Sequence, residues 1–229
     1  MYRKIFFILL LAGSGFLSAA AQSPVQRDLN PFSELNVGDR IIVRLVKAEK
    51  EYALIQVQGI DESSVKTEIK GNQLEISVYG EPFTKKKVML TLYYVNLNAI
   101  TVTGGADVTT TSLFKANELT VDLKSGGMLY LDADVENLRG KIVEGALLTA
   151  EGYATNMEMT VSTTATLSAY DLECEKVMIK ASAGGKAKVN VESELNAEAA
   201  SKGFISYKGS PSKISRNAIS GGTISIYEQ

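Results

Sequence analysis

The chain of 229 residues carries 24 lysine and arginine residues against 26 aspartate and glutamate residues, and it contains one cysteine and no histidine. The lack of histidine excludes Ser-His-Asp and Cys-His catalysis and the usual zinc sites, and a single cysteine excludes an internal disulfide. A mildly acidic chain is a poor match to nucleic acid, so no nucleic-acid partner is expected.

The first 21 residues have the layout of a secretory signal peptide. Arg3 and Lys4 precede an apolar run from Ile5 to Leu17, and a small-residue cleavage site ends at Ala21. The run is short for a membrane span, although an uncleaved anchor is the alternative. We therefore expect export to the periplasm or the outer surface of a Gram-negative bacterium, with no transmembrane segment after cleavage.

Residues 22–33 show no periodicity and are interpreted as a leader segment. The domain itself is expected over residues 34–229. Its first part, 34–96, contains alternating, strand-like runs such as NVGDRIIVRLV and NQLEISV, and Gly71-Asn72 predicts a turn between two of them. This part has no clear period. We expect either irregular coils or a cap on the amino-terminal end of a repetitive structure.

Residues 97–229 repeat with a period near 19. A small residue marks each turn, at Gly127, Ala146, Ala165, Gly185, Gly203 and Gly222. Relative to this marker, three columns are apolar in all six repeats. The columns begin with Leu119, Leu123 and Leu129, whereas the column that begins with Tyr130 holds residues that can face water. Alternation of this kind indicates strands with one buried side.

The repeat predicts an all-β fold, a parallel β-solenoid with coils of about 19 residues and glycine-rich turns between two facing sheets. One unit cannot bury its apolar side alone, so neighbouring coils must cover it. The structural turn residues are Gly104, Gly105, Gly126, Gly127, Gly184, Gly185, Gly203, Gly221 and Gly222. Because Ala146 and Ala165 replace glycine at the marker, we expect the turn to change type there.

The chain resembles the "putative autotransporter adhesin" head domain, also called the GIN domain. The resemblance rests on FSELNVGDRIIVRLV, NQLEISV, LNAITVTGGADV, the recurring Ser-Gly-Gly turns and the segment Tyr207 to Pro211. It covers about residues 32–229. It implies a right-handed β-solenoid and an adhesion role, and it supplies no catalytic residue. The missing Ser-Gly turns in VEGALL and STTATL depart from the pattern.

The best candidate for a ligand face is a set of outward residues on one strand, Tyr130, Asp132, Asp134 and Glu136. Three carboxylates on one face could bind Ca²⁺ or act on a polysaccharide, whereas the alternative is a solvated acidic face. No catalytic, cofactor-binding or metal residue is assigned. Cys174 is interpreted as inert, and Tyr207 as a core residue.

Three functions remain open from the sequence. The first is a non-enzymatic exported binding or adhesion module that presents repetitive faces to a glycan or another envelope protein, with a homo-oligomer possible. The second is a polysaccharide-active enzyme that uses Asp132 and Asp134, which rests on fold analogy. The third is a periplasmic structural or envelope-stress protein. No cofactor is expected.

Overall fold

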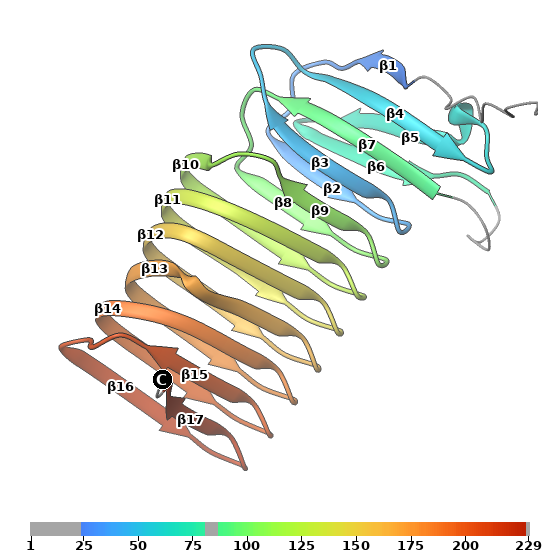
Figure 1. The fold of residues 1–229 in the computed structure, drawn as a ribbon. Helices are drawn as coiled ribbons and strands as arrows, with labels where there is room; N and C mark the ends of the chain where they lie inside the picture. Colours follow the sequence, from blue (N-terminus) through green and yellow to red (C-terminus); the bar gives the residue numbers. More distant parts are fainter. Residues whose placement is uncertain (1–23, 81–86, 228–229) are drawn as a thin grey trace, which may run out of the picture.

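The computed structural model describes residues 24–80 and 87–227, and these residues form one continuous stack of strands (Figure 1). The predicted signal peptide, residues 1–21, lies outside the described residues. Within them, no helix has the length and hydropathy needed to span a membrane.

All but one of the described elements are strands, and their bounds follow in chain order. They are β1 (Val25–Asp28), β2 (Glu34–Val37), β3 (Ile42–Lys47), β4 (Tyr52–Gln58), β5 (Val65–Lys70), β6 (Gln73–Val78), β7 (Lys87–Tyr94), β8 (Ala99–Val102), β9 (Asp107–Thr110), β10 (Phe114–Leu123), β11 (Met128–Ile142), β12 (Leu147–Val161), β13 (Thr166–Ala181), β14 (Lys186–Ala199), β15 (Phe204–Lys208), β16 (Lys213–Ala218) and β17 (Thr223–Ile226). A single 3-10 turn, Glu62–Ser64, precedes β5.

From β8 onward the chain winds into about seven coils with a spacing of about 19 residues, so the predicted β-solenoid is confirmed. Each strand pairs in parallel with its equivalent in the next coil, as in Leu129↔Leu148 and Leu148↔Leu167. The stack therefore satisfies the backbone hydrogen bonds of each coil through the coils before and after it.

The two facing sheets of the prediction are two sides of one curled sheet. Strands β11 to β14 begin on one side, curve, and end on the other (Figure 1). We call the side that contains β7, β3, β9, β15 and β17 the front face, and the side that contains β6, β2, β8 and β16 the back face. The tight turns form the turn edge of the solenoid, and the curved parts of the long strands form its bend edge.

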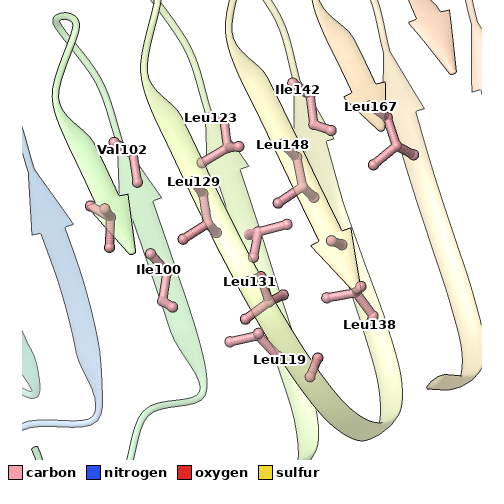
Figure 2. Packing of buried hydrophobic residues seen from close by; sticks show 14 of the residues in the cluster. Ile100, Val102, Leu119, Leu123, Leu129, Leu131, Leu138, Ile142, Leu148 and Leu167 are labelled. Carbon is pink, nitrogen blue, oxygen red and sulfur yellow. The ribbon is translucent and has the colours of Figure 1, made fainter. Parts of the chain in front are cut away.

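The apolar columns predicted from the repeat line the space between the two faces. Figure 2 shows Leu129 and Leu148 of the front face pointing toward the side chains of the back face. Fifteen of the eighteen column residues are buried, and the three exceptions all lie in the last coil. There Ile214 and Ala218 are exposed and Ile224 is half-buried. The last coil keeps the register of the buried columns, as in Leu195↔Ile214 and Ile205↔Ile224, and Ile224 packs against the core. In the described residues no further coil covers β16 and β17, so these side chains stay partly or fully exposed.

The tight turns keep one geometry throughout, so the predicted change of turn type at Ala146 and Ala165 is wrong. Both residues before the marker have positive φ, for example Thr163 (52°) and Thr164 (61°) before Ala165. The marker N–H then closes the turn by donating to the carbonyl three residues earlier, at 3.1 Å for Ala146 and 3.2 Å for Ala165. This is the pattern of a type I′ turn, and it does not require a positive φ at the marker itself.

The turn glycines therefore serve two different purposes. Those with a left-handed backbone are Gly104, Gly105, Gly126, Gly184 and Gly221. Those at the marker, Gly127, Gly185, Gly203 and Gly222, lie against the preceding coil. A Cβ on Gly127 would come within 2.4 Å of the Val102 carbonyl oxygen. At Ala146 and Ala165 the same place holds a buried methyl group.

The amino-terminal part is both an irregular coil and a cap. On the front face β3 lies between β7 and β9, and on the back face β2 lies between β6 and β8, all in parallel. The antiparallel strands β5 and β4 then cover β6 and β7, and β1 pairs with β4. The segment 22–33, interpreted as a leader, thus contributes β1 and the buried side chain of Phe32 to the cap.

Candidate binding surface along the bend edge

The structure divides the predicted ligand face into two groups. Tyr130 and Asp132 lie on the front face, where Asp132 is in register with Glu151 and Glu151 with Asp171 in the next coils. The nearby Glu151 carboxylate raises the pKa of Tyr130 by accepting from its hydroxyl, and desolvation and repulsion from Asp132 raise this pKa further. This group is a row of carboxylates at coil spacing, about 4.8 Å.

Asp134 and Glu136 instead turn toward the bend edge. The Asp134 carboxylate accepts a hydrogen bond from the Lys115 ammonium at 2.9 Å, as an exposed ion pair. Glu136 is exposed beside Lys115 and Asn117. Among the described residues, no three Asp, Glu, Cys or His side chains converge as metal ligands. The strand pleat spreads the predicted carboxylates over the surface and does not gather them around one point.

The bend edge is polar because strand alternation is interrupted at each corner. Two consecutive residues face outward there, for example Glu136 with Asn137 in β11, and Thr155 with Asn156 in β12. Register irregularities between β13 and β14 fall in the same zone. Each corner therefore doubles the number of polar side chains at this edge relative to a straight strand.

Three shallow hollows follow the bend edge and share lining residues. The first, of about 700 Å³, lies beside Tyr94 and includes Asn98, Asn117 and Glu136. The second, of about 300 Å³, shares Asn117 and Glu136 with it and reaches Tyr153. The third, of about 400 Å³, shares Asn137 with the first. We call the third the ladder hollow, since stacked amides line it.

The first hollow is held in shape by Lys47. Its ammonium donates to the Val95 carbonyl and to Asn96 Oδ1, at 3.4 Å for the latter, and lies 5.6 Å from the centre of the Tyr94 ring. In the second hollow the Tyr153 hydroxyl donates to Glu175 Oε1 at 2.6 Å, and this bond raises the pKa of Tyr153. These contacts fix side chains that border the hollows.

The ladder hollow spans β11 to β14 on the back-face side of the bend. Three amides line it, namely Asn137, Asn156 and Asn196. Asn137 and Asn156 are in register, and Asn156 Nδ2 donates to Asn137 Oδ1 at 3.1 Å. Arg139 and Glu158 lie in the neighbouring outward column, with 3.8 Å between Arg139 Nε and Glu158 Oε2. Met178 follows them in the same column. Charged, amide and apolar side chains thus meet in one hollow.

Sequence reasoning missed the ladder hollow. The available signal was the spacing of Asn117, Asn137 and Asn156, which differ by 20 and 19 residues and so follow the coil period. The columns chosen for the prediction were those that alternate regularly, and the corner residues break the alternation. The inert reading of Cys174 fits its full burial, which raises the pKa of its thiol to about 12. Tyr207 is buried as predicted.

Comparisons with known proteins agree with this architecture. A family profile described as "Putative auto-transporter adhesin, head GIN domain" matches residues 31–211. A search of curated proteins found no match.

Solved structures of similar fold come from Bacteroides and Parabacteroides species. A "putative adhesin" from Bacteroides fragilis superimposes with a TM-score of 0.75 at 21% identity, covering 90% of this chain and 98% of that one. A "putative adhesin" from Parabacteroides merdae gives 0.73 at 18% identity, with 90% and 96% covered. A "putative lipid binding protein" from Parabacteroides distasonis gives 0.66 at 14%, with 90% and 97% covered. At these identities the likeness concerns the fold.

Proposed function

Because the chain belongs to the family of "putative auto-transporter adhesin" head GIN domains, we propose that it is an exported, non-enzymatic binding module whose bend edge holds a glycan of the cell envelope or of a host surface. The family supports a binding role in adhesion. The glycan, the export and the absence of catalysis are our proposals.

One observation carries the proposal, the continuity of the three hollows along the bend edge. They extend from Tyr94 to the coil of Glu194 and are lined by amides, carboxylates and lysines in coil after coil. A polymer that repeats its own hydroxyl groups can make the same weak contacts in each coil. Several such contacts in one ligand raise the overall affinity far above that of a single contact.

The scaffold beneath the hollows suits such a role. Within the described residues no buried side-chain nitrogen or oxygen lacks a hydrogen bond. The core runs without interruption from Phe32 to Tyr207. A close-packed core holds the outward columns at fixed spacing, so a ligand meets side chains that are already positioned.

The polysaccharide-active alternative uses Asp132 and Asp134, and the geometry offers it less support. Glycosidic cleavage needs two carboxyl groups on opposite sides of one bond. Asp132 lies in the carboxylate row of the front face, whereas Asp134 turns toward the bend edge and is paired with Lys115. No specific observation favours the envelope-stress alternative.

The test of the proposed function is binding of the purified protein to an array of bacterial and host glycans. We expect binding that Asn117→Ala weakens, because Asn117 lines the first two hollows. Asn217→Ala, an exposed asparagine of β16 outside all three hollows, is the matched control. No binding to any glycan, or equal loss in both variants, would refute the proposal. New reducing or unsaturated ends in the bound glycans would favour the enzyme.

Export needs a separate measurement. Protease treatment of intact cells that express the tagged protein, beside a known periplasmic control, should remove the tag if the solenoid faces the outside. Protection until lysis would place the protein in the periplasm and would argue against direct adhesion.

A further inference from the structure

We infer that the ladder hollow binds an uncharged glycan whose sugars carry acetamido groups, and that the glycan lies along the axis of the solenoid. The inference rests on the proposed function and specifies the ligand class for one of the three hollows. Four features of the hollow support it, namely its amides, its methionine, its charge balance and its repeat distance.

The amide ladder leaves a donor and an acceptor on separate atoms. Asn156 Nδ2 donates to Asn137 Oδ1 at 3.1 Å. The other two polar atoms of the pair, Asn137 Nδ2 and Asn156 Oδ1, have no hydrogen-bond partner among the described residues. An acetamido group is complementary, because its carbonyl can accept from Asn137 while its N–H donates to Asn156. A single hydroxyl presents donor and acceptor on one atom and matches this pair less well.

An apolar surface lies next to the amides. Met178 lies in an outward column of the back face, and this apolar side chain is exposed over 43% of its surface. The methyl group of an acetamido substituent can pack on this flexible thioether side chain. A sugar that carries only hydroxyl groups offers no such methyl group.

The charges of the hollow cancel. Its lining contains Arg139 and Lys176 against Glu158 and Glu194. A charged polysaccharide in this hollow would lie beside as many like charges as opposite charges. Coulomb attraction therefore favours neither an acidic nor a basic polysaccharide over a neutral one. The same side chains can still form hydrogen bonds with the hydroxyl groups of a neutral sugar.

The repeat distance favours a glycan over a peptide. The lining residues come from four successive strands, β11 to β14, and neighbouring strands lie about 4.8 Å apart. This distance is close to the length of one sugar unit in an extended β-1,4-linked chain. Successive sugars of such a chain face opposite ways, so one acetamido group would meet every second coil. An extended peptide repeats after about 3.4 Å and would lose register within a few coils. The hollow, about 400 Å³, is within the range of about 300 to 1,000 Å³ of small-ligand sites.

The test is calorimetric titration of the purified protein with four tetrasaccharides or peptides of similar length. The probes are tetra-N-acetylchitotetraose, its fully deacetylated form, cellotetraose and an N-acetylated tetra-alanine amide. We expect the N-acetylated sugar to bind at least tenfold more tightly than the other three, because each lost hydrogen bond to a neutral group weakens binding roughly two- to tenfold.

Two variants locate the site. Asn137→Ala should weaken binding of the N-acetylated sugar about tenfold, and Asn190→Ala, a half-buried asparagine on the front face, should leave it unchanged. Met178→Ser should weaken the same sugar several-fold without changing cellotetraose. Met128→Ser is its control, because Met128 is also exposed, over 39%, but lies on the front face.

The outcomes separate this inference from the proposed function. Equal affinities for the N-acetylated sugar and cellotetraose, both reduced by Asn137→Ala, would overturn the acetamido inference and leave glycan binding intact. Tighter binding of the peptide, or binding that Asn137→Ala leaves unchanged, would also overturn it. If no sugar binds here and the glycan array is negative as well, the proposed function fails with it.

Discussion

The strongest test of the fold is the removal of one side chain from a stacked column. Leu148 is fully buried in β12 between Leu129 and Leu167 of the adjacent coils. Leu148→Ala deletes three carbon atoms, which at about 0.8 kcal/mol each accounts for about 2.4 kcal/mol. Because coils above and below are held by backbone hydrogen bonds, the space cannot close fully, and the cavity raises the cost to about 3–4 kcal/mol.

The assay is guanidinium chloride denaturation followed by far-ultraviolet circular dichroism. The matched control is Thr149→Ala, one residue along the same strand, where the side chain points outward and is half-buried. We expect its free energy of unfolding to change by no more than about 0.5 kcal/mol. Similar losses for the two variants would mean that the alternation of β12 is assigned to the wrong side.

Three further predictions concern a turn, a thiol and a tyrosine. Thr164→Gly should stabilise the protein by about 0.5–1 kcal/mol in thermal unfolding, because Thr164 has φ 61° and glycine adopts this conformation without strain, whereas a loss would contradict the turn assignment. Cys174 should react with a thiol reagent at pH 8 only on unfolding. Fast labelling of the native protein would refute this. Burial raises the pKa of the Cys174 thiol from 9.0 to about 12, so the stability gained by burying the neutral thiol is complete below about pH 9 and is lost as the pH rises toward 12. Tyr170→Phe removes the hydroxyl that donates to the buried Ser206 Oγ at 2.7 Å, and chemical denaturation should show a loss of about 1–2 kcal/mol, with no loss meaning that Ser206 finds another partner.

The regular coils could be predicted because their signal is local and repeated. Leu129, Leu148 and Leu167 recur at one place in each repeat, and the structure stacks them in register. The turn type was misassigned for an equally local reason. Glycine at the marker suggested a left-handed backbone at that position. The left-handed backbone belongs instead to the two residues before the marker, such as Thr163 and Thr164.

The amino-terminal coils and the ladder hollow could not be predicted in the same way. The placement of β2 between β6 and β8 pairs Leu35 with both Leu74 and Ile100. These contacts are distant in sequence, and no repeat marks them. Asn137 and Asn156 meet only because the corner shifts the alternation by one residue, and this shift depends on how the strand curves.

The placement of β2 and β3 inside the amino-terminal end affects how the protein folds. Strands β2 and β3 are made early in synthesis, and they obtain their outer partners only when β6 and β7 follow. This is some 40 residues later, as in the register pair Leu35↔Leu74. This end therefore needs a long loop to close before it gains contacts, which slows its formation. The later coils add to a finished template, each one over about 19 residues. We therefore expect refolding to have one slow nucleation step, followed by rapid addition of coils toward β17. Under tension we expect the coil of β16 and β17 to unfold first.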